Sequence, residues 1–191
     1  MLLKAITFNM CHGEGLDGKI DVRRQAMLIK KYKPDIVFLQ EIDMYTKRAY
    51  NKSQIYTFSK YTELPYRSMG TNIKYKNGYY GDGILSKFPL EFSCNYLSPT
   101  TYPEHEQRGF LCNKISFGSV KLNLFSVHLS VFEEERILSA KTLLRITSHI
   151  NRNERIIITG DFNIGVNKIG NHEYNFQERE TYEEYEILKE I

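Results

Sequence analysis

The stretch at residues 156–163, Ile-Ile-Ile-Thr-Gly-Asp-Phe-Asn, joins an apolar run to a polar end. Three β-branched residues in succession predict a fully buried strand. Gly160 lets the backbone approach a neighbour closely as the strand ends. Asp161 and Asn163 follow two residues apart, on the same side if the chain stays extended. The stretch therefore predicts either a site for chemistry on a rigid strand or a capped strand end where Asp161 only bonds the next turn.

Segments with strand and helix patterns alternate along the rest of the chain. Residues 2–8 have a strand pattern, Asp21 caps a helix that continues to about residue 32 with Tyr32 near its buried face, and residues 36–39 form a second buried strand. This order predicts a layered α/β fold, and without a linker or repeat we expect one domain over residues 1–191. Further predicted elements are strands at 79–86, 109–117 and 120–129, helices at 53–61, 133–150 and 178–189, and a loop at 96–106.

The composition is that of an ordinary globular protein, with 191 residues, 41% hydrophobic, 26% charged and a formal net charge of +3. This charge permits a phosphate-bearing partner but is not the concentrated basic patch typical of nucleic-acid-binding proteins. Cys11, Cys94 and Cys112 are scattered and lack metal-binding spacing. They predict reduced thiols in an intracellular protein, so we expect a cytoplasmic location. No stretch is long and apolar enough to span a membrane.

Polar side chains occupy the ends of several predicted buried strands. In layered α/β folds such strand ends converge on one rim, where active sites lie. Glu41 is a natural ligand for Mg²⁺, which is usually held by one carboxylate with waters and substrate oxygens. Its alternative role is a strand-end carboxylate facing water, and for His128 alone a buried core histidine is the more frequent explanation. The residues at these ends are Asn9, Glu41, His128, Asp161 and Asn163.

Six short segments resemble motifs of the endonuclease/exonuclease/phosphatase superfamily of metal-dependent hydrolases. Each segment alone is weak, but the ordered set spans residues 1 to about 165 and is highly specific. The Glu-Gln-Arg-Gly segment and the pair Glu135-Arg136 are most similar to the small bacterial branch of the family. The matching segments are residues 7–9 (Thr-Phe-Asn), 35–43 (Asp-Ile-Val-Phe-Leu-Gln-Glu-Ile-Asp), 80–89 (Tyr-Gly-Asp-Gly-Ile-Leu-Ser-Lys-Phe-Pro), 106–109 (Glu-Gln-Arg-Gly), 123–129 (Asn-Leu-Phe-Ser-Val-His-Leu) and 160–163 (Gly-Asp-Phe-Asn).

The resemblance implies an α/β fold of four layers, a DNase-I-like sandwich of two packed mixed β-sheets flanked by helices. It implies that Glu41 is the main Mg²⁺ ligand, with Mn²⁺ as a substitute, and that Asn9 lies close to metal and phosphate. Asp161 would orient and deprotonate the attacking water, and Asn163 would hold a phosphate oxygen. His128 would be the first of two histidines flanking the scissile phosphate. Attack on a phosphodiester anion needs this combination of neutralised charge and aligned water.

Two features depart from the family pattern. Asp82 stands where related sequences often carry asparagine, and an acid there could orient His128 and would raise its pKa. The chain also ends at Ile191 without the family's last strand and its Ser-Asp-His motif, which supplies the second histidine. We therefore expect residues 1–191 to be a truncated sandwich with unpaired strand edges, part of a longer protein. The remaining histidines, His12, His105, His149 and His172, lie in the wrong sequence contexts to replace the missing one.

Taken together, the residues favour a Mg²⁺-dependent hydrolase of phosphodiesters or phosphomonoesters, whose partner is its phosphate-ester substrate. One alternative is a DNA endonuclease or exonuclease of the same superfamily, with nucleic acid as partner. Another is a catalytically impaired protein that keeps a phosphate or metal site. For Arg108, a contact with phosphate and a position as a surface arginine are equally expected. Four tyrosines could stack on bases, although half-buried packing is the more frequent explanation: Tyr45, Tyr50, Tyr56 and Tyr61.

Overall fold

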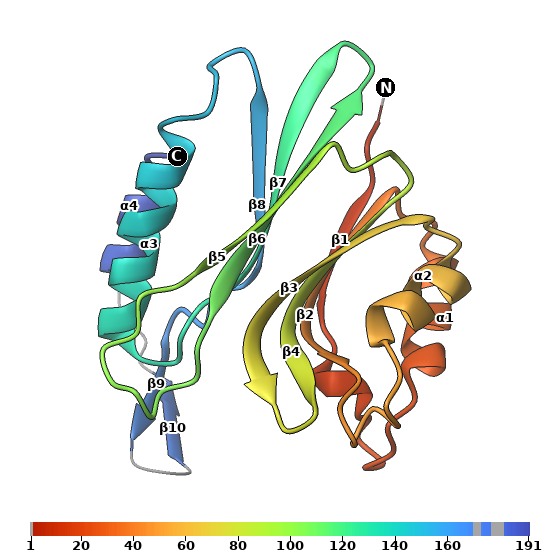
Figure 1. Ribbon diagram of the computed structural model, residues 1–191. Coiled ribbons are helices and arrows are strands. Elements are labelled where there is room, and N and C mark those ends of the chain that lie inside the picture. The colour runs from red at the N-terminus through yellow and green to blue at the C-terminus, as the bar shows by residue number, and fades with distance from the viewer. Residues whose placement is uncertain (1, 170–172, 177–181) are drawn as a thin grey trace.

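The computed structural model describes residues 2–169, 173–176 and 182–191, and its centre is a pair of four-stranded sheets (Figure 1). The first sheet contains, in spatial order, β1 (Ala5–Asn9), β2 (Ile36–Met44), β4 (Gly78–Ser86) and β3 (Tyr66–Tyr75). The second contains β5 (Phe92–Leu97), β6 (Gly109–Phe117), β7 (Val120–His128) and β8 (Arg155–Asp161). Both sheets are mixed, because β1 pairs with β2 and β7 with β8 in parallel while the other pairs are antiparallel.

Helices cover the outer faces of the two sheets (Figure 1). The first sheet is covered by α1 (Val22–Lys31) and α2 (Gln54–Thr62), and the second by α3 (Glu133–Thr147) and α4 (Glu183–Leu188). A short helical turn, η1 (Cys11–Gly13), follows β1, and β9 (Val166–Ile169) pairs with β10 (Glu173–Phe176) in a hairpin at one end of the sandwich. The helix–sheet–sheet–helix order confirms the predicted four-layer α/β sandwich.

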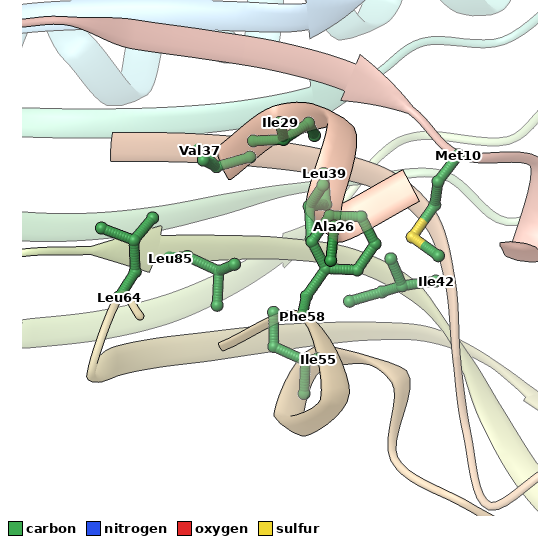
Figure 2. Packing of buried hydrophobic residues seen from close by; sticks show 10 residues of the cluster. All are labelled: Met10, Ala26, Ile29, Val37, Leu39, Ile42, Ile55, Phe58, Leu64 and Leu85. Atoms are coloured by element: carbon green, nitrogen blue, oxygen red, sulfur yellow. The ribbon is translucent and has the colours of Figure 1, made fainter. Parts of the chain in front are cut away.

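Burial of β2 on both faces explains the apolar run at residues 36–39, with which the strand begins. Val37 and Leu39 face the covering helices and pack with Phe58 of α2 (Figure 2). Ile36 and Phe38 alternate with them and face the second sheet. Burying a side chain of this size contributes about 1.5–3 kcal/mol to the free energy of folding. Because β2 is buried on both faces, it packs against the covering helices and against the second sheet.

The second sheet divides its side chains in the same way. Phe125 and Val127 of β7 pack with Leu143 of α3, whereas Leu124 faces the first sheet. Ser126 shares the face of Leu124, and its Oγ accepts a hydrogen bond of 3.1 Å from the Gln40 side chain of β2. This buried polar contact joins the two sheets close to the ends of β1, β7 and β8.

The helix caps agree with the sequence in part. Asp21 caps α1, because its side chain accepts a hydrogen bond from the backbone N–H of Arg24, as predicted. Ser53 caps α2 in the same way through the N–H of Tyr56. The expectation that Tyr32 lies near the buried face of α1 was wrong, since its side chain is exposed beyond the last turn of the helix.

The sequence analysis missed the edge strands and misplaced several boundaries. β3 and β5 are only partly buried and lack a clear apolar alternation, which is why they gave no strand signal. The loop predicted at 96–106 begins only after β5 ends at Leu97, and α3 ends at Thr147 rather than at residue 150. The tail helix predicted at 178–189 is α4 at Glu183–Leu188, with residues 177–181 lying outside the described residues. The hairpin of β9 and β10 was also missed.

β8, which contains the three isoleucines at 156–158, is only half-buried. The prediction of a fully buried strand was wrong, because β8 stands at the edge of its sheet and, among the described residues, pairs only with β7. An edge strand keeps one row of backbone groups without a ladder partner. The apolar run therefore reflects packing on its two faces, not enclosure on all sides.

No helix in the described part of the chain has the length and apolar character needed to cross a membrane. All three cysteines are free, with Cys11 exposed and Cys112 buried.

Candidate active site

Glu41 projects from a bulge inside β2. The register of β2 against β4 shifts between Leu39 and Ile42, so Gln40 and Glu41 stand opposite the single residue Asp82. Glu41 has a backbone φ of 58°. A bulge of this kind re-aims a side chain. The expectation that Glu41 ends its strand was wrong, because β2 continues to Met44.

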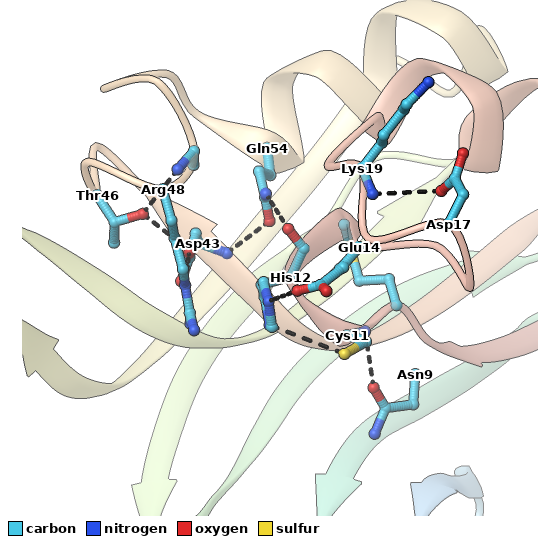
Figure 3. Close-up of polar contacts among 12 residues, drawn as sticks. Asn9, Cys11, His12, Glu14, Asp17, Lys19, Asp43, Thr46, Arg48 and Gln54 are labelled. Carbon is cyan, nitrogen blue, oxygen red and sulfur yellow. Dashed lines mark hydrogen bonds and ion pairs between the residues drawn. The ribbon is translucent and has the colours of Figure 1, made fainter.

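Asn9, the last residue of β1, connects carboxylates from the two sheets. Its side-chain Nδ2 donates hydrogen bonds of 2.9 Å to Glu41 Oε1 and 2.9 Å to Asp161 Oδ2. Its Oδ1 accepts a hydrogen bond of 3.0 Å from the backbone N–H of Cys11 (Figure 3). These three partners fix the orientation of the amide. Asn9 thus holds two acidic groups close together at the end of the sandwich.

Asp161 reaches this position because Gly160 allows two backbones to approach closely. Gly160 has a φ of +151°, and a Cβ atom there would lie 1.9 Å from the carbonyl oxygen of Val127. Asp161 is paired with His128 in the parallel register of β7 and β8, and its carbonyl accepts a hydrogen bond of 2.8 Å from the N–H of Leu129. The close backbone approach predicted at Gly160 is present, and its partner is β7.

Asn163 lies in a turn rather than in extended chain, with a φ of 49°. Its backbone N–H donates a 3.1 Å hydrogen bond to Asp161 Oδ1, and its Nδ2 donates a 3.0 Å hydrogen bond to the carbonyl of Leu129. The extended geometry considered for Asp161 and Asn163 was therefore wrong. The capped strand end is therefore present at Oδ1 of Asp161, while its Oδ2 accepts a hydrogen bond from Asn9.

His128 is buried at the end of β7, and Arg108 determines which of its nitrogens carries the proton. Arg108 Nη1 lies 2.9 Å from His128 Nδ1, and a guanidinium can only donate. Nδ1 is therefore the acceptor, and the neutral ring carries its hydrogen on Nε2, which lies 4.0 Å from Glu41 Oε1 and 3.9 Å from Asp161 Oδ2. Burial and the positive charge of Arg108 lower the pKa of His128 well below its usual range.

The expectation that Asp82 orients His128 and raises its pKa is contradicted. Asp82 is fully buried, and its Oδ2 accepts a 2.9 Å hydrogen bond from Asn72, while no hydrogen bond joins it to His128 among the contacts of the described residues. Burial raises the pKa of Asp82 to about 7. The group that orients His128 is Arg108.

The Glu-Gln-Arg-Gly segment builds the strand entry that places Arg108. Gln107 Nε2 donates to the carbonyls of Ser98 and Arg108, at 2.7 and 2.8 Å. Glu106 pairs with Arg108 at 2.7 Å. A Cβ atom at Gly109 would lie 2.3 Å from Asn72 Oδ1. The glycine therefore leaves room for Asn72, which donates a hydrogen bond to Asp82. Arg108 is largely buried within this arrangement and is not a surface arginine.

The donor set at this end of the sandwich suits a hard divalent cation. Glu41 and Asp161 are half-buried carboxylates that share one amide donor. Among the ion pairs of the described residues, no lysine or arginine neutralises either of them. The neighbouring His128 is neutral, since its pKa is lowered. Two neighbouring carboxylates without a lysine or arginine partner among the described residues fit Mg²⁺ or Mn²⁺, which prefer oxygen ligands.

Two residues next to the site were missed at the level of sequence. The structure brings Cys11 and His12 beside Glu41, with one potential ligand atom of each of the three residues within 4.8 Å of the others. The cysteine spacing along the sequence gave no sign of this cluster, and the expectation that His12 does not replace the missing family histidine stays a prediction. The parallel register of Asn9 with Gln40 brings Cys11 and His12 beside Glu41, and no local sequence pattern encodes that register.

The tyrosines considered for base stacking are mostly exposed. Tyr45, Tyr50 and Tyr56 are 52%, 68% and 55% exposed, so the half-buried packing expected for them was wrong. They line a surface hollow of about 900 Å³ beside α2, in which the guanidinium of Arg67 lies 5.0 Å from the ring centre of Tyr56. None of the residues around Asn9 and Asp161 lines this hollow.

Comparison with known proteins shows to which family this chain belongs. A family model described as the Endonuclease/Exonuclease/phosphatase family matches residues 6–177. The chain belongs to the endonuclease/exonuclease/phosphatase family. Endonucleases, exonucleases and phosphatases all hydrolyse phosphoesters, so this is a family of phosphoester hydrolases. No curated protein matches the sequence.

Solved structures share the fold of this endonuclease/exonuclease/phosphatase family chain at low sequence identity. A family protein from Beutenbergia cavernae has a TM-score of 0.70 at 17% identity, over 88% of this chain and 49% of its own. A family protein from Bacteroides thetaiotaomicron has a TM-score of 0.69 at 15% identity, over 97% and 67%. D. rerio TDP2 complexed with single strand DNA product has a TM-score of 0.62 at 23% identity, over 85% and 61%. This chain thus spans about half the length of the first of these proteins.

Proposed function

We propose that this chain hydrolyses phosphodiesters by attack of water, assisted by Mg²⁺ or, in its place, Mn²⁺. The observation that carries the proposal is the double hydrogen bond from Asn9 to Glu41 and Asp161. It gathers two carboxylates from different sheets beside a neutral histidine. Membership of a phosphoester hydrolase family supports the same conclusion.

Asp161 is proposed to orient the attacking water and accept its proton. Both of its oxygens are held, Oδ1 by the N–H of Asn163 and Oδ2 by Asn9. A carboxylate fixed in this way presents a lone pair in one direction, which positions a water before reaction. A general base of this kind contributes about 10²–10⁴-fold to the rate. Asn163 is proposed to keep the Asp161 turn closed and to offer its second amide hydrogen to a phosphate oxygen.

His128 is proposed to donate its Nε2–H to a phosphate oxygen as negative charge develops there. Because Arg108 occupies Nδ1, the ring cannot turn its donor away from Glu41 and Asp161 without losing that bond. Such preorganised donors stabilise the transition state without reorganisation. Arg108 acts through His128 and is a positioning residue rather than a phosphate ligand in this arrangement.

Glu41 is the residue proposed to hold the divalent cation, with Asn9 at its side. A cation bound there would neutralise the phosphate charge and make the phosphorus more open to attack. Asp82 is proposed as a buried support behind this group, since it stands opposite Glu41 across the bulge.

Single-stranded DNA is the natural polymer to test as a substrate. TDP2 from D. rerio, whose fold is similar, has been solved with single strand DNA product. The exposed tyrosines and cations beside α2 are the kind of surface on which bases stack. A nuclease is therefore a second candidate within the same chemistry.

The proposal is tested by hydrolysis assays with Mg²⁺ and with Mn²⁺. The substrates are bis-p-nitrophenyl phosphate, p-nitrophenyl phosphate, single-stranded and plasmid DNA, and phospholipid head groups. Glu41→Gln and Asp161→Asn are each expected to lower kcat by at least about 10²-fold, while the exposed Glu134→Gln serves as matched control. Thermal unfolding of each variant separates loss of chemistry from loss of fold. Turnover by Asp161→Asn equal to that of the unchanged chain would remove this residue from the mechanism.

A further inference from the structure

Beside the carboxylates of Glu41 and Asp161, the structure places a second set of donor atoms of different chemistry. Cys11 and His12 follow β1 in η1, and one potential ligand atom from each lies within 4.8 Å of one from Glu41 and of the other. Thiolate and imidazole ligands favour Zn²⁺ and related transition metals, whereas Mg²⁺ prefers oxygen. The hydrolytic roles proposed above use neither Cys11 nor His12.

The ring of His12 is already oriented as in a metal ligand (Figure 3). Its Nε2 lies 3.0 Å from Glu14 Oε2, and its Nδ1 lies 3.9 Å from Cys11 Sγ. A histidine that binds a metal almost always donates its other ring N–H to a carboxylate or carbonyl. Glu14 takes that place on Nε2, which leaves Nδ1 as the free lone pair on the side of Cys11.

The backbone around these two side chains is held by contacts that do not involve the side chains themselves. Gln54 Nε2 donates a 2.6 Å hydrogen bond to the carbonyl of His12, and the N–H of Cys11 donates to Asn9 at 3.0 Å (Figure 3). Cys11 and His12 both have a φ of 44°, an unusual backbone conformation for such residues. The segment is therefore positioned by its surroundings, and the thiol and the ring remain available to a ligand.

We propose that Cys11, His12 and Glu41 form a binding site for a thiophilic divalent cation of the Zn²⁺ class, with Glu14 orienting His12. Ligand atoms around a tetrahedral Zn²⁺ lie about 3.5 Å apart, given bond lengths near 2.0–2.3 Å. The three potential ligand atoms lie within 4.8 Å of one another here, so they must move closer together when an ion binds. Three protein ligands leave the fourth position for water or an oxygen of a ligand.

The site has a consequence for the proposed hydrolysis, although it does not depend on it. Glu41 is shared between the two ion sites, so a Zn²⁺-class ion and Mg²⁺ compete for one carboxylate. Cells or buffers rich in the softer ion would then hold the protein in a form with less Mg²⁺ bound. Transition-metal binding at this place is a property of the chain that hydrolysis assays in Mg²⁺ alone do not reveal.

The test is a titration of the reduced 191-residue chain with Co²⁺, a spectroscopic substitute for Zn²⁺. Binding through a thiolate gives a sulfur-to-cobalt charge-transfer band in the near ultraviolet, and tetrahedral coordination gives intense visible bands. We expect the charge-transfer band in the unchanged chain and its loss in Cys11→Ser. We expect at least about tenfold weaker Co²⁺ binding in His12→Ala, in Glu14→Ala and in Glu41→Gln.

Cys94→Ser is the matched control, because it removes a cysteine outside the site and should keep the band. Circular dichroism and thermal unfolding establish that each variant is folded. Absence of the band in the unchanged chain, or Co²⁺ affinity unaltered by Cys11→Ser or His12→Ala, would overturn the proposal. Because the readout is absorption and not turnover, failure here leaves the proposed hydrolysis standing, and a chain inactive toward phosphoesters leaves this site standing.

Discussion

The single contact between Arg108 and His128 determines the chemical form of the histidine in the site. A permanent donor on Nδ1 leaves Nε2 as the only ring position for the hydrogen. Burial, together with the charge of Arg108, keeps the ring neutral by lowering its pKa. His128 is thus a neutral donor with a fixed tautomer that faces two carboxylates, whereas a histidine in water exchanges between tautomers and titrates at about pH 6.5.

Asp82 supplies a residue-scale test through the pH dependence of stability. Its pKa in the folded chain is raised from 3.8 to about 7, because it is fully buried. Between these values the folded state keeps a proton that the unfolded state loses, so stability falls as pH rises through this window. Asp82→Asn should remove that loss and stabilise the protein at pH 8 by up to about 4 kcal/mol, since one pKa unit corresponds to about 1.36 kcal/mol.

Chemical denaturation at pH 5 and pH 8 measures this effect. The unchanged chain should lose more stability than Asp82→Asn between the two values. Asp17→Asn is the control, because Asp17 is exposed and its pKa is lowered to about 2, so it does not titrate in this window. Parallel pH profiles for the unchanged chain and Asp82→Asn would contradict the expectation.

At the scale of elements, irregularities in the strands aim the functional side chains. The bulge in β2 turns Glu41 out of the ladder. The backbone contact of Gly160 with Val127 brings the end of β8 against β7, so that Asp161 lies beside His128. The regular parts of both strands supply stability, and the irregular residues supply the site.

Gly160→Ala tests this element-scale argument. The new methyl group would lie 1.9 Å from a backbone oxygen, so the end of β8 must move away from β7. We expect a loss of more than about 3 kcal/mol, beyond the ~1–2 kcal/mol typical of a left-handed backbone conformation alone. Denaturant unfolding measures the loss.

Gly118→Ala is the matched control for this change. Gly118 has a φ of +62°, but a Cβ there meets nothing within 4 Å. Gly118→Ala should therefore lose only the ~1–2 kcal/mol of stability that a left-handed backbone conformation costs a residue with a side chain. Equal losses in the two variants would mean that the contact with Val127 is not responsible.

At the scale of the whole molecule, buried polar contacts between distant segments join the layers. Gln40 of the first sheet donates to Ser126 of the second. Arg136 of α3 pairs with Glu184 of α4 at 2.7 Å, with side chains only 1% and 0% exposed. Such a pair holds two helices in one arrangement, because neither charge is stable alone in the interior.

The pair of neighbouring glutamates in α4 offers a sharp test of that docking. Glu184→Gln leaves the charge of Arg136 buried with a weaker partner and should cost about 3–5 kcal/mol. Glu183→Gln removes a carboxylate that is 58% exposed and lies 3.3 Å from Lys141, and it should cost less than about 1 kcal/mol. Denaturant unfolding of both variants gives the comparison. A similar small loss in both would show that α4 does not depend on the buried pair.

The sequence by itself determined the architecture and the identity of the main polar residues. β2 and β7 were predictable because burial on two faces requires a local apolar run, and the motif residues Asn9, Glu41, His128 and Asp161 stand close together in the structure. The contact of Arg108 with His128 was also within reach, since counting back from the turn at Gly118 pairs Gly109 with His128. The edge strands β3 and β5 were missed because strands that are only partly buried carry no clear alternation of apolar and polar residues.

Only the tertiary structure decided how these residues act. The bulge at Glu41, the half-exposed edge of β8 and the approach of Cys11 and His12 to Glu41 depend on the register of strands far apart in sequence. Asn9 meets Asp161 across 152 positions of chain. Local periodicity encodes which face of a strand is buried, but not which distant strand lies against it. Strand pairing and packing decide which distant strands lie together. They thereby determine which nitrogen of His128 carries the hydrogen, the burial of Asp82, and the cluster of sulfur, nitrogen and oxygen donors beside Glu41.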